Sequence, residues 1–301
     1  MEMINTFLDY YSKAKMMQEH KFEGASYTKE DINDDLIWHV PIYDVVNRKY
    51  AAFSSLLEAI VHKEKDPKGN GINFVTNNVS AEDFVDLCYL FRLCGSGINY
   101  KPKTTDEPWG THGFGNFWIA ELLRNGIDDR NQWMYFMPDD KFCDVKGYLL
   151  PMIKGGLRNF VLNDAMLLIY HIKDFINKTD YVGIKDVVDV GNNWLKERGY
   201  MRQNFVLTAF AMDLAEYFPY LVDRDSDVYV GSNAKKCLKL ILPNMKQDEA
   251  IRYLCKITGN HSKPYDMEDV ACDFIRYINN FQSSDHILMN NNITYKNNVS
   301  Q

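Results

Sequence analysis

Hydrophobic residues recur every three or four positions along most of the chain, which is the spacing of one buried helix face. This pattern predicts about ten helices, over residues 2–20, 43–62, 80–93, 149–160, 163–177, 183–198, 205–217, 234–242, 247–258 and 266–281. No stretch alternates strongly enough between apolar and polar residues to predict a sheet. We therefore predict an all-α, compact multi-helix fold with at most minor β structure.

Two places in this pattern need a prediction of their own. The short apolar run Ile37–Pro41 suits a brief strand or an extended lead into the next helix, because proline disfavours helix at the residue before it. In the helix over 163–177, His171 follows an apolar run, which predicts a buried histidine.

The same pattern suggests three segments. Residues 1–75 form an N-terminal helical segment, and residues 76–282 form a larger helical domain. Residues 283–301 form a polar, Asn-rich tail that we expect to be disordered beyond about Asn290.

Composition restricts the partners of the chain. It has 301 residues, of which 46% are hydrophobic, so it can bury a sizeable core. The net charge of −7 and the absence of a Lys/Arg block restrict any nucleic-acid contact to a local basic patch. The first residues do not read as a signal peptide, and no apolar run reaches transmembrane length, so we expect a cytoplasmic protein without a membrane partner.

The six cysteines are scattered, without a C-x-x-C pair or a Cys/His cluster at zinc spacing. Most lie in apolar helical settings, which predicts reduced core thiols. We predict no metal site and no cofactor.

The stretch from Asn204 to Leu242 holds the main candidate site. Its first helix, Phe205–Tyr217, is apolar on nearly every face and is therefore expected to be buried, yet it carries Asp213 and Glu216. A buried carboxylate must be paired, hydrogen-bonded or protonated. The alternative is that both acids lie on one polar edge, with Asp213 capping a neighbouring helix.

An acidic connector follows, with Asp223, Asp225 and Asp227 at alternate positions. An EF-hand beginning at Asp223 requires Gly at its sixth position and Glu at its twelfth, but the chain has Val228 and Ala234 there. We reject an EF-hand. A metal held by two of the acids and a solvated acidic turn both stay open.

The next helix opens on Gly231, Ser232 and Asn233, and Ser232 or Asn233 is expected to be its N-cap. Free N–H groups at a helix start attract anions. Lys235 and Lys236 in the first turn oppose the helix dipole, which favours an anionic ligand such as a phosphate. The alternative is an ordinary capped surface helix.

A second candidate site follows the long connection 95–111. His112 is a candidate general acid or base, or a contact to a base edge, although a structural hydrogen bond is the commoner role of such a histidine. Phe114 lies between two glycines that allow close backbone approach, Asn116 is a candidate N-cap, and Trp118 follows.

Two motifs in the central stretch resemble known families. The run Asp225-Ser226-Asp227-Val228 resembles the D-x-x-V pattern of the helix-hairpin-helix DNA glycosylase superfamily, without the Gly-x-Gly element that precedes it there. The runs 210–214 and 230–235 more closely resemble the glycosylase-like helical families of thymine hypermodification, namely the α-glutamyl/putrescinyl thymine pyrophosphorylases and the helical domain linked to hydroxymethyl-deoxyuridine DNA kinases.

This resemblance implies a DNA-glycosylase-like domain and an enzyme that replaces pyrophosphate on a flipped 5-hydroxymethyluracil with an amine. Its partners would be DNA and a small amine or amino-acid co-substrate. It implies that Asp225 or Asp227, with His112, takes the amine proton. The implied phosphate-binding residues are Gly231, Ser232, Asn233, Lys235 and Lys236. The implied stacking or pocket residues are Phe114, Asn116, Trp118, Asp213 and Tyr229.

Two other functions stay open. One is a monofunctional DNA glycosylase that hydrolyses an N-glycosidic bond, with Asp225 stabilising positive charge on the sugar. The other is a helical module that binds nucleic acid or protein without catalysis. The sequence also leaves open the base, the nucleophile, the oligomeric state, and the choice among DNA, RNA and a free nucleotide.

Overall fold

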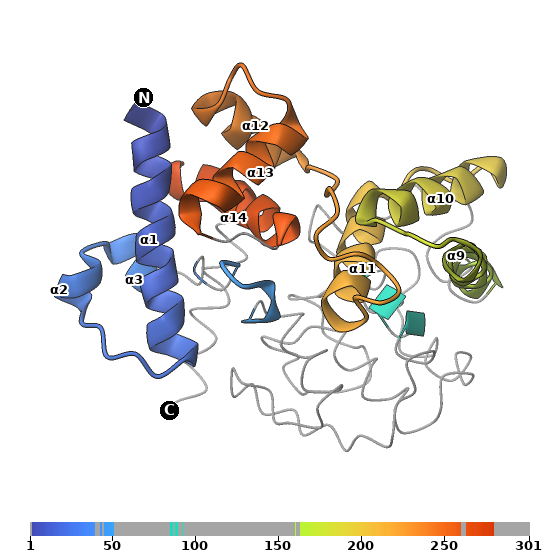
Figure 1. The fold of residues 1–301 in the computed structure, drawn as a ribbon, viewed down its shortest axis with the longest axis horizontal. Coiled ribbons are helices and arrows are strands. Elements are labelled where there is room, and N and C mark those ends of the chain that lie inside the picture. Colours follow the sequence, from blue (N-terminus) through green and yellow to red (C-terminus); the bar gives the residue numbers. More distant parts are fainter. Residues whose placement is uncertain are drawn as a thin grey trace, which may run out of the picture. The chain divides into compact units, whose positions relative to one another are not determined.

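The computed structural model describes residues 2–39, 43, 45–50, 85–86, 88–89, 92, 160, 163–259 and 263–279. In these residues the chain forms nine α-helices and one short 3-10 helix, with a single isolated bridge between Gly183 and Asp223 (Figure 1). The predicted all-α fold is confirmed. None of the described helices is both long enough and apolar enough to cross a membrane. The predicted boundary near residue 75 and the tail 283–301 lie outside the described residues.

The described residues divide into two compact units. We call residues 2–50 with 224–279 the terminal unit, and residues 85–223 the middle unit. The central stretch 204–242 contributes to both. The terminal unit contains α1 (Glu2–Phe22), α2 (Lys29–Ile32), α3 (Asp35–His39), the 3-10 helix η1 (Arg48–Tyr50), α12 (Ser232–Ile241), α13 (Gln247–Thr258) and α14 (Pro264–Ile278).

An aromatic core joins α1 to α14 in the terminal unit. Helix α1 buries Phe7, Tyr10, Ala14 and Met17, which helical spacing brings to one face. The ring of Phe274 on α14 meets Phe7 edge to face, with 5.2 Å between centroids and 77° between planes. Helix α14 also packs against α12 and α13, so it is the central helix of this unit.

Two short segments of the terminal unit differ from the predictions. Residues 35–39 form α3 instead of a strand or an extended lead, because the carboxylate of Asp34 accepts hydrogen bonds from the N–H groups of Leu36 and Ile37 at 3.0 and 3.1 Å. The helix predicted from residue 43 is wrong for the described residues up to 50, which form turns and η1. There, Asp266 of α14 accepts the N–H of Arg48 at 3.0 Å and holds the chain in a tight turn.

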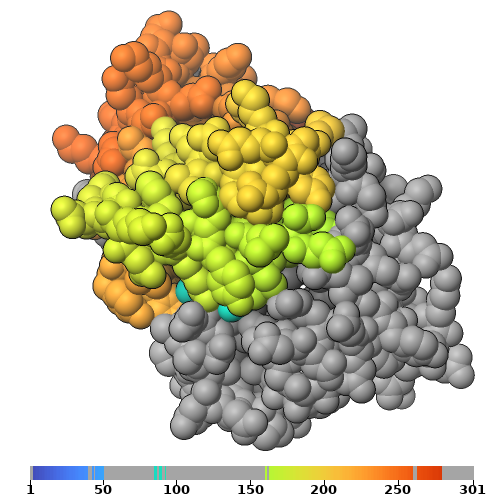
Figure 2. Space-filling model, turned by 90° about the vertical axis from the view of Figure 1, so that its right-hand side faces the viewer, coloured from blue at the N-terminus to red at the C-terminus, as the bar shows by residue number. Residues whose placement is uncertain are grey.

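The middle unit contains α9 (Ala165–Lys178), α10 (Ile184–Glu197) and α11 (Asn204–Tyr217), together with helical residues between 85 and 92. Helix α10 packs closely on α11 at Gly191. A Cβ atom there would lie 2.8 Å from both δ carbons of Leu207, so glycine permits the approach. Figure 2 shows the outer surface of α9 and α10 in green and yellow.

Helix α11 is buried, as its sequence predicts. Every residue from Val206 to Ala215 is buried, and the helix ends at Tyr217, shortly before Pro219. Tyr89 packs edge to face on Phe210, with 5.4 Å between centroids, and its hydroxyl donates to Oε1 of Gln203 at 2.9 Å. The predicted burial of His171 on α9 is wrong, because the apolar face of α9 is formed by other residues: Met166, Leu168, Ile169 and Ile172.

The described cysteines are free thiols, as predicted. Cys88, Cys237 and Cys255 are buried, and Cys272 is half-buried. Burial raises the pKa of Cys237 to about 12 and is the main reason that the pKa of Cys255 rises to about 11. These two thiols therefore stay protonated near neutral pH and are poor nucleophiles. Cys94 and Cys143 lie outside the described residues.

Candidate functional site at the start of helix α12

Most of the predicted site residues of the central stretch lie in the terminal unit, in and before the first turn of α12. Lys235 lies over the ring of Tyr229, with Nζ 5.3 Å from the centroid, which is within the range of a cation–π contact. Ser232 and Lys236 are exposed, and Asn233 is half-buried. The structure therefore brings an aromatic ring, two lysines and the start of a helix together.

The N-cap of α12 is Gly231. The predicted N-cap, Ser232 or Asn233, was therefore one or two residues too late in the chain. Gly231 has extended backbone and offers no side chain to cap the helix. Its own N–H donates to Oε1 of Glu268 on α14 at 2.8 Å. A Cβ atom at position 231 would lie 3.1 Å from that oxygen, so the carboxyl fits closely against a glycine. Because Glu268 holds the backbone here, the helix begins at Ser232.

Glu268 was not among the predicted site residues, and its carboxyl is almost fully buried, with 7% of the residue exposed. Burial is the main reason that its pKa rises to about 8, and the negative charges of Asp269 and Asp273 add to the rise. The N–H of Gly231 and the guanidinium of Arg48 act in the opposite direction. At neutral pH the protonated form predominates. The positive end of the α12 dipole is therefore not cancelled by this group.

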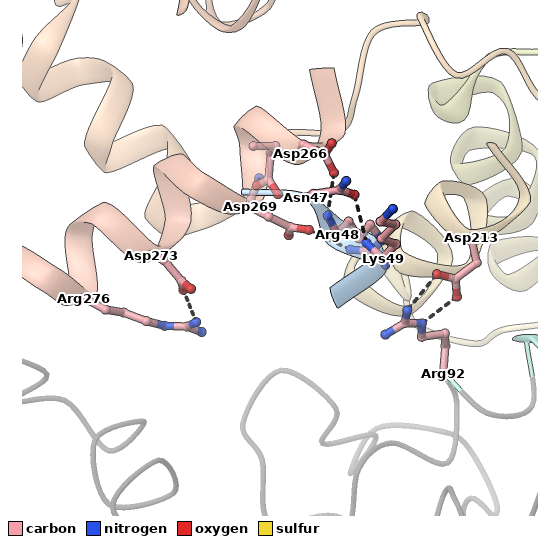
Figure 3. A network of polar contacts seen from close by, with 11 residues as sticks. Asn47, Arg48, Lys49, Arg92, Asp213, Asp266, Asp269, Asp273 and Arg276 are labelled. Carbon is pink, nitrogen blue, oxygen red and sulfur yellow. Dashed lines mark hydrogen bonds and ion pairs between the residues drawn. The ribbon is translucent and has the colours of Figure 1, made fainter. Parts of the chain in front are cut away.

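Acids on α14 also hold the 3-10 helix η1 in the terminal unit (Figure 3). Asp266 binds the N–H of Arg48, and Asp269 pairs with the guanidinium of Arg48 at 2.8 Å. Farther along α14, Asp273 pairs with Arg276. The signal in the sequence was the spacing of Asp266, Asp269 and Asp273, which puts three acids on one helix face. The contacts of these three acids hold η1 and α14 in place.

The acidic connector is divided between the two units. Asp223 belongs to the middle unit, where its carboxylate accepts the hydroxyl of Tyr181 and its N–H donates to the carbonyl of Val182 at 2.8 Å. In the terminal unit, Asp227 pairs with Arg252 of α13 at 2.8 Å, and Arg252 also donates to the carbonyl of Asp225 at 3.3 Å. Among the described residues, no group of three or more His, Cys, Asp or Glu side chains is arranged to hold a metal ion.

Asp213 is fully buried in the middle unit and is paired, as a buried carboxylate must be. Its two oxygens accept from Nε and Nη2 of Arg92 at 2.6 and 2.7 Å, in a bidentate ion pair (Figure 3). Asp213 lies in the core and not on a polar edge, so that part of the alternative is wrong. Arg92 was missed, although it is the one arginine near the end of the apolar helix predicted over 80–93.

The second candidate site, with His112, Phe114, Asn116 and Trp118, lies outside the described residues. It stays a prediction.

No protein-family model matches the chain, and comparison with curated proteins and with solved structures finds no match. Function must therefore be inferred from the residues and their geometry.

Proposed function

We propose that the chain is a DNA base-modifying enzyme that binds phosphate at the start of α12 and replaces pyrophosphate on a flipped 5-hydroxymethyluracil with an amine. The supporting observation is the grouping of Tyr229, Lys235 and the uncapped first turn of α12 in one unit. An aromatic ring offers a stacking surface for a base, and the helix start and lysine offer charge to a phosphate.

The leaving group defines what this site must do. The C–O bond to pyrophosphate breaks, and pyrophosphate leaves with the electron pair. Lys235, Lys236 and the N–H groups of the first turn would stabilise this negative charge. Glu268 does not oppose them near neutral pH, because its carboxyl is then mostly protonated.

The amine must lose a proton as its nitrogen forms the new bond to the exocyclic methylene carbon. Asp225 and Asp227 precede the start of α12 by a few residues. Asp227 is ion-paired with Arg252, and Asp225 is exposed to solvent and stands at the Asp position of the D-x-x-V pattern. We assign the proton acceptor to Asp225 and give Asp227 the role of holding the turn through Arg252.

Asp225→Asn is expected to lower amine-dependent pyrophosphate release from DNA carrying the pyrophosphorylated base by at least about 100-fold, because general-base catalysis contributes about this much. The measurement is pyrophosphate release under single-turnover conditions. Asp189→Asn is the matched control, since Asp189 is an exposed acid on α10. Unchanged release by Asp225→Asn would remove Asp225 from the chemistry.

A specific observation also favours a second function, a helical module that binds without catalysis. Arg252 holds both the carboxylate of Asp227 and the carbonyl of Asp225, so the acidic turn is fastened by the chain's own contacts. Such a turn has a structural explanation without any substrate. DNA retention without any change to the DNA would favour this second function.

A further inference from the structure

The exposed charged residues of α12, α13 and their connection 242–246 are mostly basic. Five of them are cations, and we call these residues the basic face: Lys236, Lys239, Lys246, Arg252 and Lys256. Glu249 is the exposed acid among the described residues 231–259, and Asp248 is half-buried. The whole chain carries a net charge of −7. Because Arg252 is paired with Asp227, the four lysines carry the local excess of positive charge on this acidic protein.

Exposed apolar side chains lie among these cations. Tyr253 and Ile257 on α13 are each 37% exposed, and Leu240 and Met245 are 43% and 42% exposed. The helices already bury other residues on their inner sides: Ala234, Cys237, Leu238 and Ile241 on α12, and Ala250, Ile251, Leu254 and Cys255 on α13. The exposed apolar residues therefore belong to the outer surface and not to the core.

Helix α10 does not share this charge pattern. On α10, the exposed charged residues are Asp186, Asp189, Lys196 and Glu197, which are mostly acidic. The concentration of exposed cations on α12 and α13 is thus not found on α10, although α1 also exposes Lys15 and Lys21.

We propose that the basic face is the surface on which the phosphate backbone of duplex DNA docks. This inference rests on the proposed function and locates the DNA contact that it requires. A polyanion is repelled by the net charge of the chain and is attracted where cations are concentrated. Lysine ammonium groups attract phosphates as point charges, and phosphate contacts carry no sequence information. The lysines of the basic face therefore suit docking of the DNA backbone without recognition of its bases.

The contacts of Arg252 and the sequence position of Lys236 connect the basic face to the candidate site. Arg252, in the middle of α13, binds the turn that carries Asp225 and Asp227. Lys236 follows Lys235, which contacts Tyr229. DNA docked along α12 and α13 would therefore pass beside the proposed proton acceptor and the stacking ring. A flipped base would not need to travel far from the docked backbone.

The test is the double variant Lys239→Glu/Lys256→Glu, which reverses two exposed charges and leaves the candidate site residues unchanged. Affinity for a short fluorescent duplex, followed by anisotropy across a salt titration, is expected to fall at least about tenfold at low salt. The slope of log affinity against log salt is expected to become shallower by about two, because roughly one counterion is released for each phosphate contact.

The matched control is Lys15→Glu/Lys196→Glu, which makes the same charge change at exposed lysines on α1 and α10. It is expected to retain affinity within about twofold and to keep the salt slope. An equal loss in both double variants would overturn the inference, since net charge alone would then explain binding. Loss of binding to anionic phosphatidylserine vesicles with DNA affinity intact would overturn it in favour of a membrane surface.

This experiment separates the inference from the reaction. Wild-type protein that binds DNA through the basic face but releases no pyrophosphate would support the inference and contradict the proposed reaction. Release of pyrophosphate that charge reversal does not slow at subsaturating DNA would support the reaction and contradict the inference. Thermal unfolding of both double variants checks that the fold is retained.

Discussion

Asp213→Ala is expected to lower the free energy of unfolding by about 3–5 kcal/mol, because it removes the carboxylate that forms a bidentate ion pair with the buried guanidinium of Arg92. Both side chains are nearly inaccessible to water, at 1% and 3% exposed for Asp213 and Arg92. A buried charge that loses its partner keeps the full cost of its desolvation. Urea denaturation followed by circular dichroism measures the change.

Two variants make this prediction specific. Arg92→Met/Asp213→Leu is expected to recover much of the lost stability, since removing both members of the ion pair leaves neither of them buried without the other. Asp174→Ala breaks an exposed ion pair with Lys178 on α9 and is expected to cost less than about 1 kcal/mol. A loss below about 1 kcal/mol for Asp213→Ala would show that the pair is not desolvated as the structure describes.

Glu268→Gln is expected to make the chain increasingly stable relative to wild type as pH rises from about 5 to about 8. The pKa of Glu268 is raised from 4.5 to about 8 in the folded protein, chiefly by burial. Between these values the folded state holds a proton that the unfolded state releases. The resulting stability is fully present below the unfolded pKa and is lost as pH rises through the folded pKa.

Glutamine keeps an oxygen that can accept the N–H of Gly231. Its side chain cannot ionise, so the variant avoids the loss of stability with rising pH. The difference between variant and wild type should grow by an amount on the order of a few kcal/mol, because one unit of pKa corresponds to about 1.4 kcal/mol. Urea denaturation at several pH values measures it.

The control for this prediction is Glu249→Gln, which neutralises an exposed acid on α13. Its difference from wild type should change little with pH over the same range. A difference for Glu268→Gln that is independent of pH would mean that Glu268 is ionised in the folded protein throughout. The start of α12 would then carry a negative charge, which weakens the case for a phosphate there.

The helices of this chain could be predicted because their determinants are local. Helix α13 has the predicted bounds, Gln247–Thr258, and α11 ends close to Pro219 as expected. The spacing of apolar residues and a helix-breaking proline both determine the backbone conformation within a few residues. The prediction failed at α3 and at residues 43–50. At α3 the cap of Asp34 outweighed the apolar pattern, and at residues 43–50 a contact from a distant helix decided the backbone.

The polar contacts of the site depend on pairs that are far apart in sequence. Arg92 and Asp213 are 121 residues apart, and Gly231 and Glu268 are 37 apart. A carboxylate in an apolar helix predicts that some partner exists, but it does not identify the partner. Tyr229 and Lys235 were both named from the sequence, one for stacking and one for phosphate, but the contact between them was not predicted.

The proposed reaction is tested most directly by mass spectrometry of nucleosides from DNA that carries pyrophosphorylated 5-hydroxymethyluracil, after incubation with the chain and a pool of amines. We predict a new nucleoside whose mass corresponds to an amine joined to the methylene carbon, formed by wild-type protein and not by Asp225→Asn. Free base and abasic sites would instead identify a glycosylase. DNA that is retained by the protein but remains chemically unchanged would contradict the proposed chemistry and leave a binding module.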